Sequence, residues 1–196
     1  TGPSACTNLL SSKFTEPGGE LDPQSMAGTV RIVPVINLPG YRSKSRYFPD
    51  GRDLNRAFPG LSKGSTTSRV ASTVKKNLID DSDVIIDLHS AAVGRSNMPQ
   101  IRGDLSHPES YLLAKAFGIE VVLDSRPPKG SLRRVANGMD IAAVTYEGGE
   151  ANQLDQVAVK VAVEGCLNVL KSLKVIPKNP ARPRFRLNAG GSTWLR

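Results

Sequence analysis

The sequence contains few of the residues that mark membrane, secreted or nucleic-acid-binding proteins. No apolar run approaches the roughly 20 residues that a membrane helix requires, and no basic-then-apolar start of a secretory signal is visible. The two cysteines, Cys6 and Cys166, are far apart and lack metal-ligand spacing, which predicts reduced thiols. Aromatic residues make up 5% of the chain, so the basic residues have no interleaved rings on which bases could stack. We therefore expect a cytoplasmic protein that binds neither membrane nor nucleic acid.

The two ends of the sequence also lack the features of a complete protein. The chain begins TGPSACTNLL, without methionine, and ends AGGSTWLR after a basic, proline-rich stretch. We expect residues 1–174 to form one domain that is incomplete at its N-terminus. We expect residues 175–196 to form a linker and the start of a further domain.

Positive charge, by contrast, is plentiful and unevenly placed. The net charge is +8, and residues 31–76 carry ten Lys or Arg against two Asp. At the centre of this basic region lies RYFPDGRDLNRAFPG, residues 46–60, whose prolines and glycines disfavour helix and strand. Clustered arginines in an irregular loop predict recognition of a small anionic molecule.

Apolar runs alternate with helical patterns along the chain. This alternation is typical of an α/β fold with a mostly parallel or mixed sheet and helices on both faces. The apolar, β-branched runs predict strands, whereas capping residues and four-residue spacing predict helices. The expected strands cover residues 29–38, 83–90, 120–125 and 141–149, and the expected helices cover residues 4–14, 65–78, 107–118, 130–139 and 153–173.

Three polar clusters follow expected strands. The arginine loop follows residues 29–38, DLHS closes the strand at residues 83–90, and TYEGGE closes the strand at residues 141–149. Ligands of open α/β sheets bind beyond the carboxyl ends of the strands. We therefore expect these clusters to converge in one crevice.

His89 and Glu147 are the candidates for chemistry at the strand ends. His89 stands two residues after Asp87, where it could be a metal ligand oriented by a carboxylate or a histidine satisfied by a local hydrogen bond. Glu147 precedes two glycines, which allow close approach of a substrate, so it could be a general base or a solvated rim residue. Glu150 competes for the same role. A catalytic zinc site needs three protein ligands, and His89 alone does not supply them.

The arginine loop offers candidates for anion recognition. The candidates are Arg46, Arg52, Asn55 and Arg56. A guanidinium forms planar, bidentate hydrogen bonds to a carboxylate or phosphate, and an arginine near a scissile carbonyl could also stabilise the oxyanion. The alternative is a solvated loop in which the arginines form ion pairs with Asp50 and Asp53. The pattern alone does not decide between these interpretations.

Taken together, the segments PVINLPGYRSKSRYFPDGRDLNRAFPG, DLHS and VTYEGGE resemble the succinylglutamate desuccinylase/aspartoacylase family, a branch of the zinc carboxypeptidase superfamily. The likeness runs from Thr1 to about Leu173, and DLNRAFPG followed by DLHS is its most specific part. The resemblance implies a zinc-carboxypeptidase-like fold. It also implies a zinc-dependent hydrolase that removes the acyl group from a small N-acylated amino acid or a related carboxylate.

The resemblance also implies roles for the candidate residues. His89 would be the third zinc ligand, and Glu147 would activate water and then protonate the leaving amine. Arg46 would polarise the scissile carbonyl, while Asn55 and Arg56 would hold the substrate carboxylate.

The resemblance also implies that two aspartates orient the zinc-binding histidines. Asp53 resembles the carboxylate that orients a zinc histidine, and Asp87 would orient His89.

The chain departs from the family in one important respect. The family's first two zinc ligands lie in a His-Gly-x-Glu segment, which this sequence lacks. The family's smaller C-terminal β-domain would start near RFRLNAGGSTWLR. We therefore expect residues 1–174 to be a zinc-hydrolase catalytic domain without its first two ligands, so that the parent protein is an enzyme while this chain binds zinc weakly and is inactive.

Two alternative functions stay open at this point. The chain could belong to a non-catalytic carboxylate-binding relative that has lost the metal site, or to a carboxypeptidase-type peptidase that acts on a peptide terminus. A homo-oligomer is compatible with each of these interpretations.

Overall fold

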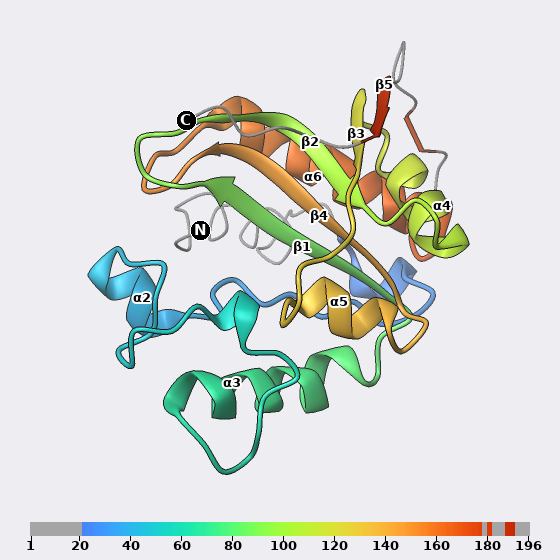
Figure 1. The fold of residues 1–196 in the computed structure, drawn as a ribbon. Helices are drawn as coiled ribbons and strands as arrows, with labels where there is room; N and C mark the ends of the chain where they lie inside the picture. Colours follow the sequence, from blue (N-terminus) through green and yellow to red (C-terminus); the bar gives the residue numbers. More distant parts are fainter. Residues whose placement is uncertain (1–20, 178–179, 182–186, 191–196) are drawn as a thin grey trace.

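A five-stranded mixed sheet forms the centre of the molecule (Figure 1). The computed structural model describes residues 21–177, 180–181 and 187–190. The strands lie in the order β1-β4-β2-β3-β5, with β4 parallel to β1 and antiparallel to β2, and β3 parallel to both β2 and β5. The expected α/β class is confirmed. The strands are β1 Val84–Ala91, β2 Asn97–Gly103, β3 Val121–Asp124, β4 Ala142–Glu150 and β5 Leu187–Gly190.

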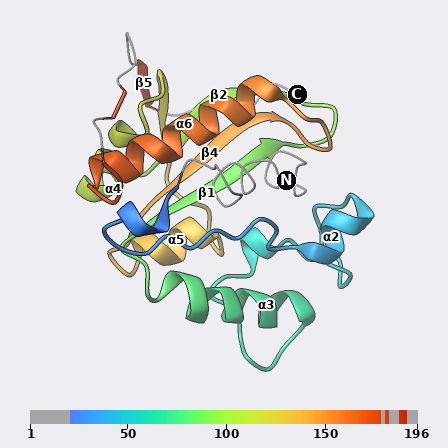
Figure 2. The same cartoon turned by 180° about the vertical axis from the view of Figure 1, so that it is seen from behind.

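Helices cover both faces of this sheet. Helices α4 and α6 pack on one face with the larger apolar cluster, and α3 and α5 pack on the other (Figures 1 and 2). Side chains of Ser65, Ser131 and Asp155 cap α3, α5 and α6 by accepting backbone hydrogen bonds. The helical segments are η1 Pro23–Ser25, α2 Leu38–Ser43, η2 Leu54–Arg56, α3 Thr66–Val74, η3 Lys75–Ile79, α4 Pro108–Phe117, α5 Leu132–Asn137 and α6 Gln156–Ser172.

Four of the five expected helices are therefore confirmed, with small differences at their ends. The fifth, at residues 4–14, lies outside the described residues. Within the described part of the chain, no helix has the length and apolar character needed to span a membrane.

Alternation along β4 assigns its side chains to the two faces. Val144 and Tyr146 lie in the cluster under α4 and α6, whereas Ala143 lies in the cluster under α3 and α5. Because successive strand residues point to opposite faces, Thr145 and Glu147 lie on the α3–α5 side. The same argument applied to β1, where Ile85 packs under α3 and α5, places Asp87 and His89 on that side too.

Close packing of α6 on α4 depends on a glycine. Phe117, 1% exposed, stacks on Tyr146 with ring centroids 5.6 Å apart. A Cβ atom at Gly165 would lie 2.0 Å from Cε1 of Phe117, so glycine leaves room for the aromatic ring. The Tyr146 hydroxyl donates a 2.7 Å hydrogen bond to the Ala158 carbonyl, which fixes β4 against α6.

The strand expected at residues 29–38 is wrong. Residues 29–36 form no helix or strand, and α2 begins at Leu38. No backbone hydrogen bond joins residues 29–36 to other residues that the structure describes. A cavity separates this segment from β1, since residues 27–37 and 81–90 both line it. An apolar, β-branched run becomes a strand only where another strand accepts its hydrogen bonds, and none of the five described strands pairs with this segment.

Two strands lie where none was expected. Residues 97–103 form β2 between β4 and β3, although the sequence NMPQIRG has no continuous apolar run. Residues 187–190 form β5 and pair with β3 in the same sheet. The expected domain boundary after residue 174 stays a prediction.

Candidate functional site

The parallel pairing of β1 with β4 brings His89 beside Glu147. These two residues are register partners, and so are Asp87 and Thr145, which lie two residues earlier on the same strands. The side chains of His89 and Glu147 are each 14% exposed, and that of Asp87 is 17% exposed. The two expected polar clusters at the ends of these strands do converge.

His89 lies between two carboxylates. Its Nε2 atom is 2.8 Å from Oδ2 of Asp87, and its Nδ1 atom is 3.9 Å from Oε1 of Glu147. Burial is the largest influence on the pKa of His89 and lowers it, but the charge and hydrogen bond of Asp87, followed by the charge of Glu147, outweigh burial and raise the pKa overall. The contact expected between Asp87 and His89 is present, while the roles of both residues stay predictions.

Arg46 and Asp53 form an ion pair in the arginine loop. Nε and Nη2 of Arg46 both donate to Oδ2 of Asp53, at 3.0 and 2.6 Å. Burial raises the pKa of Asp53, yet the hydrogen bond and charge of Arg46 outweigh it, so the pKa lies below its ordinary value. Oδ1 of Asp53 accepts the Asn55 backbone N–H at 2.9 Å and caps η2. This ion pair with Asp53 was expected under the alternative interpretation of the loop, in which its arginines pair with its own aspartates. Oδ2 of Asp53 is therefore engaged by Arg46.

Asn55 fixes the loop against helix α5. Its Oδ1 atom accepts the Leu132 backbone N–H at 2.9 Å, and the Phe58 N–H donates to the Gly130 carbonyl at 2.9 Å. Arg56 is exposed, and its Nη1 atom donates to the Asn55 carbonyl at 2.6 Å. The loop therefore presents the Asn55 side chain toward α5, whereas Arg56 is exposed to solvent.

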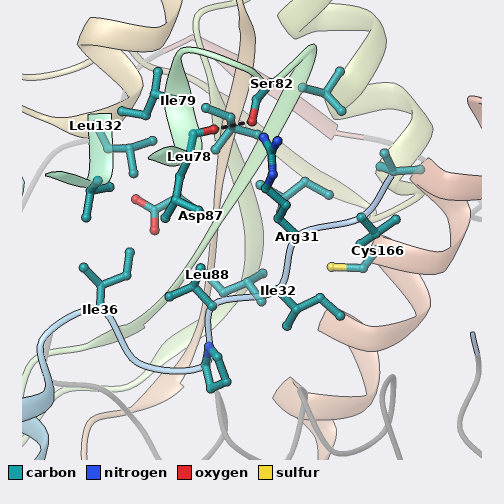
Figure 3. A pocket seen from close by; sticks show the side chains of 18 of the residues that line it. Arg31, Ile32, Ile36, Leu78, Ile79, Ser82, Asp87, Leu88, Leu132 and Cys166 are labelled. Atoms are coloured by element: carbon teal, nitrogen blue, oxygen red, sulfur yellow. Dashed lines mark hydrogen bonds between the residues drawn. The ribbon is translucent and has the colours of Figure 1, made fainter. Parts of the chain in front are cut away.

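A cavity of about 710 Å³ connects the loop to β1 (Figure 3). Arg46, Asp53 and Asn55 line it from the loop, and Asp87 and His89 line it from β1. Figure 3 shows the Asp87 carboxylate among aliphatic side chains of this lining. The cavity extends past these groups to Cys166 of α6, whose thiol pKa burial raises to about 12. The lining thus combines aliphatic side chains with the polar groups of the site and, elsewhere, with Arg31, Asp81 and Ser82.

Two further residues near Glu147 escaped sequence reasoning. Asn97 donates a hydrogen bond from Nδ2 to Oε2 of Glu147 at 2.9 Å. Arg133 of α5 is 5% exposed and donates from Nη1 to the Ser125 carbonyl at 2.7 Å. Burial lowers the pKa of Arg133, and the charges of Asp104, Asp87 and Glu147 act in the opposite direction. No sequence signal distinguished this arginine, because α5 also carries Arg134 next to it and both read as ordinary polar helix residues.

The described residues do not by themselves fit a zinc site. No three His, Cys, Asp or Glu side chains within the described ranges are grouped so that they could hold a metal ion. His107 is the N-cap of α4, where Nδ1 accepts the Ser110 N–H and Nε2 lies 3.1 Å from Asp140. His89 is therefore the single histidine of the site, and a catalytic zinc requires three protein ligands.

Comparisons with known proteins agree with the sequence motifs. The model of the succinylglutamate desuccinylase/aspartoacylase catalytic domain matches residues 18–173. A 68-residue stretch, 34% of this chain and 20% of the relative, is 43% identical to N-alpha-acetyl-L-2,4-diaminobutyric acid deacetylase of Halomonas elongata.

Solved structures show the same fold. The product-bound ectoine utilization protein EutE (DoeB) of Ruegeria pomeroyi has a TM-score of 0.87 at 22% identity, covering 98% of this chain and 60% of that one. A succinylglutamate desuccinylase/aspartoacylase of Rhodobacter sphaeroides has a TM-score of 0.81 at 24% identity, covering 92% and 55%. This chain thus spans little more than half the length of these solved relatives. The matched family model covers most of the chain, and the chain therefore belongs to the succinylglutamate desuccinylase/aspartoacylase catalytic domain family.

Proposed function

We propose that this chain carries the proton-transfer and substrate-binding residues of a deacylase that hydrolyses the amide of a small N-acylated amino acid. The observation that carries the proposal is the placement of three largely buried side chains beside a cavity that the arginine loop also lines. Glu147 is the register partner of His89, and Asp87 lies two residues before His89 on the same face of the sheet. The names of the family and of the diaminobutyrate deacetylase, both of which denote deacylation, support the reaction class.

Glu147 is the group suited to move the proton. Water attacks the amide carbonyl carbon, and the Glu147 carboxylate accepts the proton that the water loses. The C–N bond then breaks, and Glu147 returns that proton to the leaving nitrogen. A carboxylic acid and an amine result.

The arginine loop supplies the positive charge. A guanidinium has five N–H donors, and two of those on Arg46 contact Asp53. The others remain to stabilise the negative charge that develops on the carbonyl oxygen. His89 would be one ligand of a zinc ion whose remaining ligands lie outside the described residues. Zinc at this place would supply Lewis-acid activation of water and carbonyl.

The proposal is tested by hydrolysis and metal content together. We expect the full-length gene product to release amine from at least one of N-acetyl-L-2,4-diaminobutyrate, N-acetylaspartate and N-succinylglutamate, with about one zinc per chain by elemental analysis. Residues 1–196 alone should hold little zinc and show little turnover. A full-length product that binds these carboxylates without hydrolysing them would contradict the proposal and favour a non-catalytic carboxylate-binding protein.

Arg56 gives a separate prediction about binding. Its exposed guanidinium can swing to a substrate carboxylate, so Arg56→Ala should raise KM about tenfold or more while kcat changes little, as expected for a lost charged hydrogen bond. Steady-state kinetics on the best substrate measure this split. Arg42→Ala, an exposed arginine of α2, is the matched control and should leave both constants unchanged. An unchanged KM in Arg56→Ala would exclude a carboxylate clamp at this residue.

A further inference from the structure

We propose that Asn97 is a positioning residue that holds the Glu147 carboxylate for proton transfer. This inference rests on the proposed function, because it assigns Asn97 to the group that moves the proton. Nδ2 of Asn97 donates to Oε2 of Glu147 at 2.9 Å, and Oε1 of the same carboxylate faces Nδ1 of His89 at 3.9 Å. The amide therefore holds one carboxylate oxygen and leaves the other directed into the site.

An irregularity in the sheet creates this contact. Gln100 of β2 is opposite Glu147 of β4, and in a regular antiparallel ladder Asn97 would be opposite Glu150, with its side chain on the other face from Glu147. The register instead shifts by one residue between Asn97 and Gln100, which places Asn97 opposite Gly149. Residues opposite Gly149 and Glu147 share a face, so the bulge turns the amide toward the carboxylate.

The residues of the bulge fit this interpretation. Pro99 has no backbone N–H to donate to a ladder, and the Met98 side chain is 64% exposed, so neither residue favours regular central pairing. A neutral amide also suits the role, because it fixes the orientation of a carboxylate without placing a full positive charge beside it. An arginine in place of Asn97 would hold the Glu147 carboxylate more firmly and make it a weaker base.

Kinetics of two Asn97 variants test the inference in the full-length gene product. Asn97→Asp keeps the shape of the side chain and removes the N–H donor, and Asn97→Ala removes both. We expect each to lower kcat about tenfold or more, with KM within about twofold of the wild-type value. Asn77→Ala, which removes an amide on the outer surface of the helix that follows α3, is the control and should leave kcat unchanged.

A double-mutant cycle separates positioning from a general structural role. In a Glu147→Gln background, Asn97→Ala should cause no further loss of the residual rate, because the group that it positions is already disabled. Additive losses, or an unchanged kcat in Asn97→Asp, would overturn the inference. Failure of the proposed function has a different signature, since Glu147→Gln itself would then leave turnover unaffected.

A spectroscopic measurement tests the contact without turnover. The side-chain amide signal of Asn97 in a proton–nitrogen correlation spectrum, assigned by its loss in Asn97→Asp, should move in Glu147→Gln and stay in place in Glu150→Gln. Glu150 is the matched control, because it lies three residues along the same strand and contacts the Gly94 N–H instead. An Asn97 signal that does not respond to Glu147→Gln would also overturn the inference.

Discussion

Glu147→Gln in the full-length gene product should lower kcat by roughly 10²–10⁴-fold, the usual contribution of a general acid–base group. Glutamine keeps the size of the side chain and its hydrogen bond with Asn97, but it accepts no proton at neutral pH. The metal content should not change, because a residue that only transfers protons is not a ligand. The measurements are the rate of amine release and elemental analysis of the same sample.

The neighbouring carboxylate provides the comparison for this prediction. Glu150 lies on the same strand, and its Oε1 atom accepts the Gly94 N–H at 2.7 Å. Glu150→Gln should keep turnover within about tenfold of the wild-type rate, because Glu150 binds the backbone of a loop and transfers no proton in the proposed reaction. Loss of metal in Glu147→Gln would contradict the assignment of the general base to Glu147. A loss of turnover in Glu150→Gln that exceeds the loss in Glu147→Gln would contradict it too.

Gly165→Ala should lower the free energy of unfolding by about 2 kcal/mol, a large share of the stability of a domain. Alanine in a helix is favoured over glycine by about 1 kcal/mol, so helix propensity alone predicts stabilisation. The new Cβ atom, however, would lie 2.0 Å from Cε1 and 2.2 Å from Cζ of Phe117. That ring is buried and stacked on Tyr146, so it cannot move aside without disturbing β4. Urea denaturation of residues 1–196 measures the change.

Gly138→Ala is the matched control for the packing argument. Gly138 also has a negative φ, and its nearest neighbour atom would lie 3.3 Å from an added Cβ, so we expect a change below about 0.5 kcal/mol. Gly165→Ala combined with Phe117→Leu should cost less than the sum of the two single changes, because the smaller side chain relieves the clash. A stabilised Gly165→Ala variant would show that α6 and α4 are less tightly packed than the structure indicates.

The sequence predicted the fold best where local patterns and burial agree. Residues 84–91 and 142–150 begin as apolar runs and carry polar residues in their second halves, and they form the two paired strands of the candidate site. Residues 29–36 have the same local pattern but form no backbone–backbone hydrogen bond with other described residues, so local preference was not sufficient. Strand β2 was missed for the opposite reason, because long-range pairing with β4 overrides a sequence that contains Pro99 and Arg102.

The site was predictable only as a set of residue types. His89, Asp87 and Glu147 could be placed at strand ends from the sequence, and parallel pairing then brought them together. The partner of Glu147 could not be foreseen, because Asn97 reaches it through a register shift that no local pattern encodes. The ion pair between Arg46 and Asp53 likewise depends on the conformation of the loop, because the two residues are seven positions apart in the sequence.

The order of the strands has a consequence for how this domain can diversify. Strand β4 lies between β1 and β2, so the connection at residues 92–96 must cross the carboxyl end of β4, where Glu147 stands. The Gly94 N–H bond to Glu150 ties the crossing to the strand beneath it. Insertions or deletions in this short bridge would leave the ladder pairing of all five strands untouched. New ligand preferences could thus evolve by changes in the length of one loop, while Glu147 and His89 stay where the sheet holds them.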